Sequence, residues 1–208
     1  MNRELQEYIE REIIPRYEAF DAAHRVDHVR YVVNESLRLA KHYDVDEDMV
    51  YAIAAFHDTG LVEGRERHHI VSGQIVRADE VLKRIFTPEQ IAVMSDAVED
   101  HRASNHHEPR TIYGRIVAEA DRQIDVDVTL RRTVQYGLSH YPHLDKESQY
   151  ERMLEHLAEK YAEGGYLKLY IPESANAEHL AKFRALIADA ERLRDAFKQI
   201  YSEETSGK

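Results

Sequence analysis

Residues 52–60, AIAAFHDTG, decide how this chain folds and where its chemistry lies. Small and apolar residues fill the stretch up to Phe56, which is typical of a helix buried on every side. Gly60 ends that helix, so that His57 and Asp58 occupy its last turn. Burying such a pair costs on the order of several kcal/mol unless both groups are paired or bound to a metal ion. The stretch therefore predicts a buried helix that carries an imidazole and a carboxylate at its C-terminal end.

The composition limits the chemistry that these two residues can take part in. The 208 residues include 13 His and no Cys, so any metal ion must be held by His, Asp and Glu. The net charge of −11 argues against binding to a nucleic-acid polymer, but it permits a small anionic ligand if a local cation neutralises that ligand. Because no apolar run reaches the length of a signal peptide or a membrane span, we expect a cytoplasmic protein that does not contact a membrane.

The rest of the chain has the pattern of an all-α protein. Apolar residues recur every three or four positions, and we expect no strand. Thr87-Pro88-Glu89-Gln90 has the pattern of a capping box with proline at the first helical position. Without a linker or repeat, we expect one domain over residues 1–208, with its core at about 20–130 and packing helices at about 131–203. The expected helices cover residues 2–14, 27–43, 46–60, 69–86, 87–101, 111–124, 128–141, 145–163 and 177–203.

Two more polar residues stand on helices that pack through apolar residues. Asp121 lies in RIVAEADRQI, and His28 precedes the apolar stripe of residues 29–40, with His24 as an alternative at the same helix start. Since these helices must pack together, their His and Asp side chains can converge on one divalent cation.

The order His28, His57-Asp58, Asp121 on consecutive helices resembles the HD superfamily of metal-dependent phosphohydrolases. The resemblance covers about residues 20–130 and includes AIAAFHDTG around the pair and AEADR around the last Asp. It implies that these four residues bind a first metal ion, and that His57 and Asp58 are catalytic.

Two further histidines are similar to those of HD proteins that hold two metal ions. His69, in HHIVSG, matches a His-x-x-x-Gly segment of symmetrical dinucleoside tetraphosphate hydrolases, and His101 lies in AVEDHR. The resemblance implies that Asp58 bridges two ions and that His69 and His101 hold the second. His68 stays an alternative to His69, since only the spacing to Gly73 separates them.

The resemblance implies a phosphohydrolase in which metal-activated hydroxide cleaves a phosphoester or phosphoanhydride bond. We expect a small phosphorylated substrate, with a nucleotide favoured, and the sequence is compatible with a homo-oligomer. Mixed His and carboxylate ligands favour Fe or Mn, with Co, Ni and Zn as alternatives. Two other functions stay open: a mixed-valence di-iron oxygenase of HD type, and a non-catalytic nucleotide-binding regulatory module. The candidates for substrate binding are Arg65, Arg102, Arg122 and Asp125, with His106 as a further residue at the mouth of the site.

Overall fold

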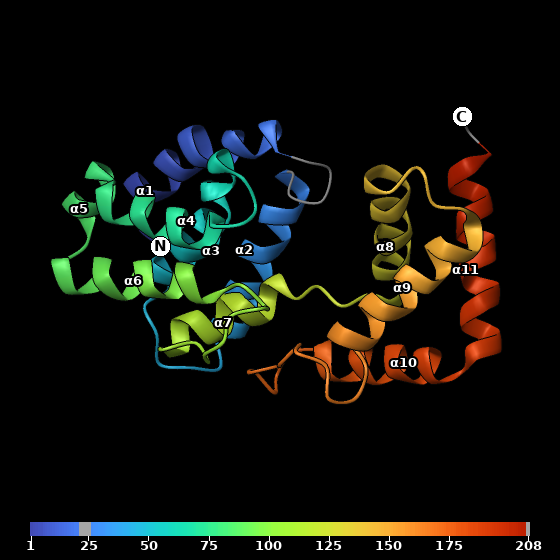
Figure 1. Ribbon diagram of the computed structural model, residues 1–208. Helices are drawn as coiled ribbons and strands as arrows, with labels where there is room; N and C mark the ends of the chain where they lie inside the picture. Colours follow the sequence, from blue (N-terminus) through green and yellow to red (C-terminus); the bar gives the residue numbers. More distant parts are fainter. Residues whose placement is uncertain (21–25, 207–208) are drawn as a thin grey trace. The chain divides into compact units, whose positions relative to one another are not determined.

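The computed structural model describes residues 1–20 and 26–206, and these residues form helices and no strand (Figure 1), which confirms the all-α prediction. None of the helices in these two ranges combines the length and the apolar content needed to cross a membrane. Contacts within the chain define two compact units. Unit 1 contains residues 1–122 and 169–174, and unit 2 contains residues 123–168 and the chain from 175 onward. The single domain over 1–208 stays a prediction.

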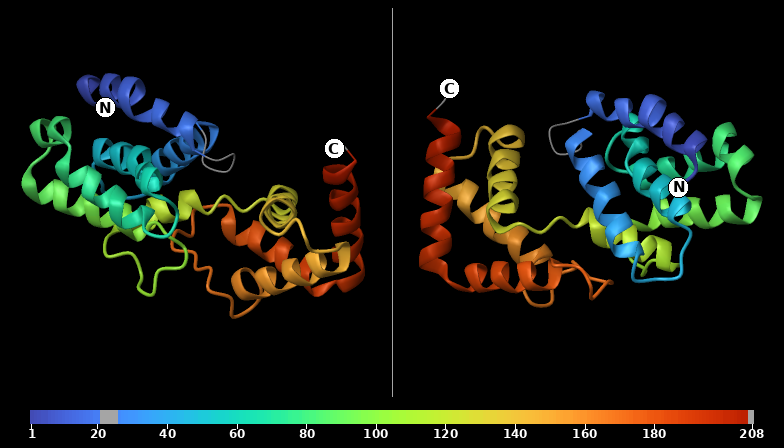
Figure 2. Two further views of the ribbon diagram at one scale, coloured as in Figure 1. Left: turned by 45° about the horizontal axis from the view of Figure 1, so that its top comes forward. Right: turned by 180° about the vertical axis from the view of Figure 1, so that it is seen from behind.

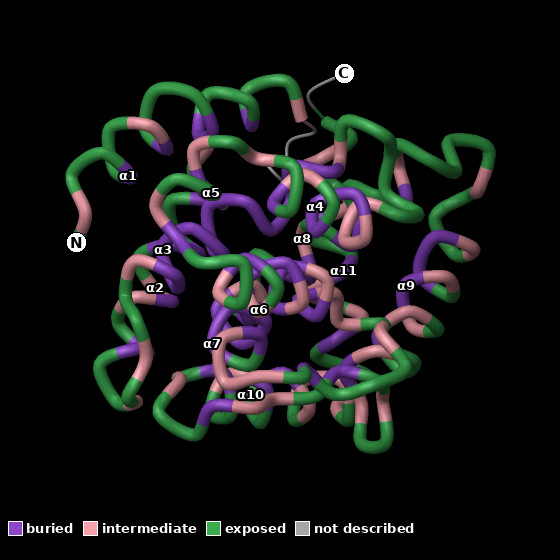
Figure 3. Tube along the Cα trace, turned by 90° about the vertical axis from the view of Figure 1, so that its left-hand side faces the viewer, coloured by how far each residue is buried: buried purple, intermediate pink, exposed green. Residues whose placement is uncertain are grey.

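Unit 1 is a helical core built around one buried helix, α3. Every residue of α3 from Met49 to Phe56 is buried, and the helix packs against α2, α6 and α7 (Figures 2 and 3). Its start is fixed by Asp46, whose carboxylate accepts hydrogen bonds from the backbone N–H groups of Asp48 and Met49. The elements of unit 1 are α1 (Arg3–Tyr8), the π-helix η1 (Ile9–Ile13), the 3-10 helix η2 (Ile14–Ala19), α2 (Val26–Ala40), α3 (Glu47–Phe56), the 3-10 helix η3 (Thr59–Glu63), α4 (His68–Ala78), α5 (Glu80–Ile85), α6 (Pro88–Asp100) and α7 (Ile112–Asp121).

Two expected helices of unit 1 are interrupted. The helix expected over 69–86 ends at Ala78, because Asp79 is extended and its carboxylate caps α5 through the N–H groups of Val81 and Leu82. The helix expected over 2–14 changes to a π-helix at Ile9, and Pro15 lies in the 3-10 helix that follows. The capping box at Thr87 and Gln90 is confirmed, with both reciprocal hydrogen bonds present.

Unit 2 consists of four helices with a core of its own. They are α8 (Val126–His140), α9 (Lys146–Lys160), α10 (Asn176–Ala188) and α11 (Ala190–Thr205). The single helix expected over 177–203 is broken at Asp189, which leaves helical geometry and caps α11 through the N–H of Arg192. Side chains buried in this unit include Leu130, Met153, Leu157, Phe183, Leu193 and Phe197.

Residues 169–174, which we call the clasp segment, return to unit 1 and are held by a buried carboxylate on α7. The side chain of Glu119 accepts hydrogen bonds from Tyr170 N (2.6 Å), Ile171 N (3.3 Å) and the hydroxyl of Ser174 (2.5 Å). Glu119 has no exposed surface, so these bonds replace the water that a carboxylate otherwise requires. The clasp segment is therefore part of unit 1, although it follows the first two helices of unit 2 in the chain.

We predict that Glu119→Ala lowers the free energy of unfolding by about 2–4 kcal/mol, because two backbone N–H groups lose their acceptor. Glu119→Gln keeps one acceptor oxygen and should cost less. Urea denaturation followed by circular dichroism measures both values, with Glu18→Ala as the control at an exposed glutamate of η2. Equal stability of Glu119→Ala and Glu18→Ala would contradict the assigned role of the clasp segment.

Candidate metal centre

The C-terminal end of α3 presents His57 and Asp58 to the same space. Adjacent residues on a helix diverge by about 100°, but the backbone leaves helical geometry at Asp58 (φ −108°, ψ 6°). As a result, Nε2 of His57 and Oδ2 of Asp58 lie 3.2 Å apart. Both side chains are buried, with residue exposures of 0% and 3%. The local break in the helix thus explains how two neighbours reach one point.

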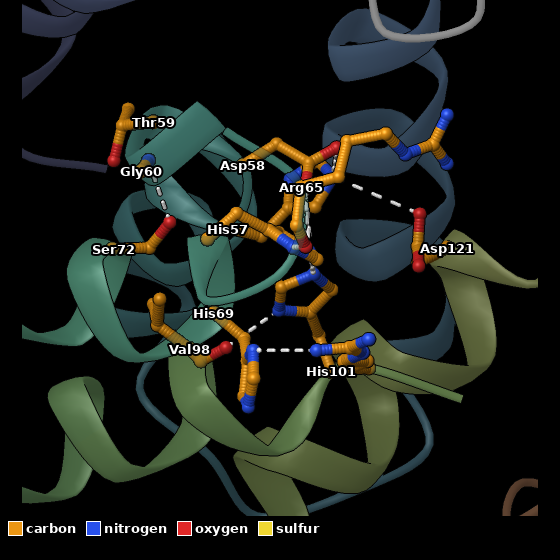
Figure 4. Close-up of polar contacts among 12 residues, drawn as sticks. His57, Asp58, Thr59, Gly60, Arg65, His69, Ser72, Val98, His101 and Asp121 are labelled. Carbon is orange, nitrogen blue, oxygen red and sulfur yellow. Dashed lines mark hydrogen bonds and ion pairs between the residues drawn. The ribbon is translucent and has the colours of Figure 1, made fainter. Parts of the chain in front are cut away.

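Gly60 lets the start of α4 approach this turn closely. Its N–H donates a hydrogen bond to the Ser72 hydroxyl at 2.8 Å. A Cβ atom at this position would lie 2.1 Å from the carbonyl oxygen of His68, so no larger residue fits. The close approach brings the first turn of α4 to the His-Asp pair, and Figure 4 shows the Gly60–Ser72 contact beside it.

Four side chains from three helices meet in what we call the first group: His28, His57, Asp58 and Asp121. His28 Nε2 lies 3.3 Å from His57 Nε2, 3.2 Å from Asp121 Oδ1 and 3.8 Å from Asp58 Oδ2. His57 Nε2 lies 3.7 Å from Asp121 Oδ1. The structure thus brings together all four residues predicted for the first metal ion. The ligand atoms of His28, His57 and Asp58 all lie within 4.8 Å of one another, close enough to hold one cation, and Asp121 adjoins the two histidines.

The second oxygen of Asp58 belongs to what we call the second group, with His68 and His101. Asp58 Oδ1 lies 3.3 Å from His68 Nε2 and 3.4 Å from His101 Nε2, and the two nitrogens are 3.2 Å apart. Figure 4 shows His101 directed from the end of α6 toward the His57–Asp58 turn. One oxygen of the Asp58 carboxylate therefore faces each group.

Three of the histidines are held in the same tautomer. The Nδ1 atoms of His57, His68 and His101 lie 2.7, 2.8 and 2.6 Å from the carbonyl oxygens of Ala54, Arg65 and Val98. A carbonyl oxygen only accepts, so Nδ1 carries the proton and a neutral ring presents the lone pair of Nε2. This is the arrangement of metal-binding histidines, whose outer nitrogen is oriented by a second hydrogen bond.

The facing lone pairs fit a bound cation. The nitrogens of His28 and His57, and those of His68 and His101, face each other across 3.3 and 3.2 Å. Such pairs repel unless a proton or a cation lies between them, and the carboxylate oxygens beside them are also acceptors. The residues present therefore fit divalent metal ions held by His and Asp.

The pKa values of the metal-free centre reflect the burial of these groups and the short distances between them. Burial acts to lower the pKa of His57, but the negative charges of Asp58 and Asp121 raise it to about 9. Against the effect of burial, His57 and His101 hold the pKa of Asp58 well below its usual range. Burial and the neighbouring His101 lower the pKa of His68 to about 4. Without a metal ion, a proton on His57 thus offsets the charge of the carboxylates.

The structure places His68, and not His69, in the second group. Adjacent residues on α4 point in different directions, so only one of the two histidines can face Asp58. His69 Nδ1 instead lies 3.4 Å from a guanidinium nitrogen of Arg102. Burial and the charge of Arg102 lower the pKa of His69 to about 4. The alternative first ligand, His24, lies outside the described residues.

The residues predicted to bind substrate occupy different environments. Arg65 is exposed in the turn before α4, whereas Arg102 donates to the carbonyl oxygen of Glu66 at 2.5 Å. Arg122 is 7% exposed and donates to the carbonyl oxygen of Ala118, with its guanidinium 4.9 Å from the centre of the Tyr170 ring. Asp125 lies in unit 2, where its carboxylate caps α8, and His106 is exposed.

Tyr17 contributes to the centre and was not among the predicted residues. Its buried hydroxyl donates to the carbonyl oxygen of Ala55 at 2.9 Å and accepts the N–H of Asp58 at 3.2 Å. Burial and the charge of Asp58 raise the pKa of Tyr17, so it stays a neutral donor. The sequence contains no signal for this role. Tyr17 lies about forty positions before Asp58, and an isolated tyrosine has the pattern of an ordinary core residue.

Comparison with known proteins identifies the part of the chain that carries this centre. Residues 25–123 match the family model for the HD domain, which covers all the residues of both groups. No curated protein and no solved structure gives a significant match.

We predict that His68→Ala reduces the number of Mn²⁺ ions bound from two to one, because it removes a ligand of the second group alone. The matched variant His69→Ala should still bind two ions. Isothermal titration calorimetry with the metal-free protein measures the stoichiometry of each. Loss of an ion in His69→Ala but not in His68→Ala would reverse the assignment.

We also predict that the metal-free protein loses stability as pH rises from 6.5 to 9. The folded-state pKa of His57 is about 9, above the ordinary 6.5, so its charge stabilises the fold fully below pH 6.5 and this contribution disappears as pH rises through 9. Scanning calorimetry in EDTA measures the change in Tm. Saturating Mn²⁺ should reverse the trend, since the cation replaces the proton, and His57→Gln should flatten it.

Proposed function

Residues 25–123 of this chain match the HD domain, and from that premise we propose that the protein is a metal-dependent phosphohydrolase. It would hydrolyse a phosphoester or phosphoanhydride bond in a small molecule, with a nucleotide favoured as substrate. The observation that carries the proposal is the position of Asp58, whose two carboxylate oxygens face two separate sets of histidines. A carboxylate with one oxygen toward each set of histidines supports the proposal, because it could hold two cations side by side.

The chain's residues divide between the two proposed ions. Asp58 would bind both, with His68 and His101 completing the second site, and the remaining members of the first group would hold the other ion. This mixture of nitrogen and oxygen donors suits Fe or Mn, with Co, Ni and Zn as alternatives, whereas Mg²⁺ prefers oxygen ligands alone. Two bound cations would supply an activated water and neutralise charge on the transferring phosphoryl group.

The protein's own contribution is orientation and burial. The backbone carbonyls behind His57, His68 and His101 fix each ring, so that no rotation is needed when an ion or substrate binds. The Tyr17 hydroxyl accepts a hydrogen bond from the N–H of Asp58 and thereby helps to position the Asp58 carboxylate. The site is shielded from water on the side of α3, whose residues from Met49 to Phe56 are all buried. Electrostatic interactions with an anionic substrate are correspondingly strong.

Among the predicted substrate-binding residues, we propose Arg65 for contact with phosphate. It is exposed, and its own carbonyl oxygen holds His68, so its side chain starts next to the second group. A guanidinium suits this role because it binds phosphate oxygens in pairs. Arg122 supports the end of α7 through Ala118 and is a weaker candidate, because little of its side chain is exposed.

Activity of the metal-loaded protein tests the proposal. We expect Mn²⁺- or Fe²⁺-loaded protein to release product from at least one member of a panel of phosphomonoesters, phosphodiesters, nucleotides and dinucleoside polyphosphates. Asp58→Asn should lower kcat by about 100-fold or more, since changes in residues behind the ligands already cost about 10–100-fold. Asp127→Asn, at an exposed aspartate of α8, is the control and should leave kcat unchanged.

Two outcomes would replace the proposal with one of its rivals. Consumption of O₂ by the iron-loaded protein, without hydrolysis of the panel, would identify an oxygenase. Binding of metal and nucleotide without any turnover would identify a regulatory module.

A further inference from the structure

The second group depends on two supports of unequal rigidity. His101 stands at the end of α6, and the carbonyl oxygen that holds it belongs to Val98 of the same helix. His68 is held by the carbonyl oxygen of Arg65, which lies in the turn of residues 64–67, all of them exposed. Gly64 in this turn has a positive φ of 93°. The orientation of His68 therefore depends on a turn that has little packing of its own.

Arg102 links this turn to the end of α6. It directly follows His101, and its Nη1 donates to the carbonyl oxygen of Glu66 at 2.5 Å. The same nitrogen lies 3.4 Å from His69 Nδ1, and Nε donates to the Ser104 hydroxyl at 2.9 Å. The guanidinium thus contacts the turn, the first turn of α4 and the loop after α6 at the same time. Its planar fork of donors can make these contacts together, which an ammonium group cannot.

These contacts connect the two histidines of the second group through a short path. The residue next to His101 holds the carbonyl of Glu66, and the preceding carbonyl, that of Arg65, holds the ring of His68. We propose that Arg102 is a positioning residue for the second metal ion: it fixes the 64–67 turn and through it the ring of His68. The inference rests on the proposed two-ion function. It differs from the expectation that Arg102 binds substrate.

Binding of Mn²⁺ to the metal-free, full-length protein tests the inference, with calorimetry for stoichiometry and electron paramagnetic resonance for coupling between the ions. In Arg102→Ala, the first ion should bind within threefold of its wild-type affinity, and the second should bind at least about tenfold more weakly. Arg102→Lys should restore part of the loss, because its ammonium can still donate to Glu66.

Arg67→Ala is the matched control, since Arg67 is an exposed arginine of the same turn. Removing a positive charge by itself favours binding of a cation. A pure charge effect therefore strengthens binding in both alanine variants, whereas a positioning role weakens the second ion in Arg102→Ala alone.

A measurement without metal keeps this inference separate from the proposed function. The ¹⁵N NMR signals of His68 report its tautomer, and we expect the Nδ1-protonated form in the wild type and a mixture in Arg102→Ala, with His57 unchanged. If the wild type binds fewer than two Mn²⁺ ions, the two-ion function fails, and the tautomer of His68 still decides the role of Arg102.

Three results would overturn the inference. One is an Arg102→Ala protein that binds both ions normally and has an altered KM alone, which would assign Arg102 to substrate. The second is an unchanged tautomer of His68. The third is loss of both ions or of helical content in Arg102→Ala and Arg102→Lys alike, which would make Arg102 a support of the whole fold.

Discussion

Four imidazole nitrogens and three carboxylate oxygens face one another in the interior of unit 1, and all of them need a positive charge nearby. The rest of unit 1 can be understood from this requirement. Lone pairs at about 3 Å repel, so the helices that carry them must be held together by other forces. The buried faces of α3 and its neighbours supply that force, and the backbone carbonyls behind the rings prevent the histidines from turning away. The apolar core thus keeps together a polar centre that would otherwise separate.

The two halves of this centre differ in how they are held. The first group stands on α2, α3 and α7, which pack against one another. In the second group, His68 follows an exposed turn, and a hydrogen bond from Arg102 helps to fix that turn. Packing of apolar surface resists displacement over many contacts, whereas a single hydrogen bond contributes about 1 kcal/mol. Affinity for the two proposed ions should therefore be set by different parts of the structure.

Sequence patterns predicted the features that depend on neighbouring residues. The buried helix before His57 and the capping box at Thr87 are both local, and each is present. The convergence of His28, Asp58 and Asp121 also followed from the sequence, because helices with apolar faces must pack. The choice between His68 and His69 did not, since one position on a helix turns a side chain by about 100° and periodicity does not fix the angle that finely. Asp79 and Asp189 have the pattern of surface residues in a continuous helix, so their role as breaks became visible only in three dimensions. The contact between Glu119 and the clasp segment joins residues about fifty positions apart, and no local pattern records such a pairing.

The clasp segment makes unit 1 discontinuous along the chain. Along the sequence, α8 and α9 of unit 2 come between α7 and the residues that donate hydrogen bonds to Glu119. During synthesis, therefore, the residues of the two groups leave the ribosome before the clasp segment does. At that stage the carboxylate of Glu119 still lacks its hydrogen-bond donors. It completes its hydrogen bonds only after α8 and α9 have been synthesised. Completion of unit 1 is in this way coupled to the arrival of a later part of the chain, and the order of synthesis becomes a condition for a fully stable unit.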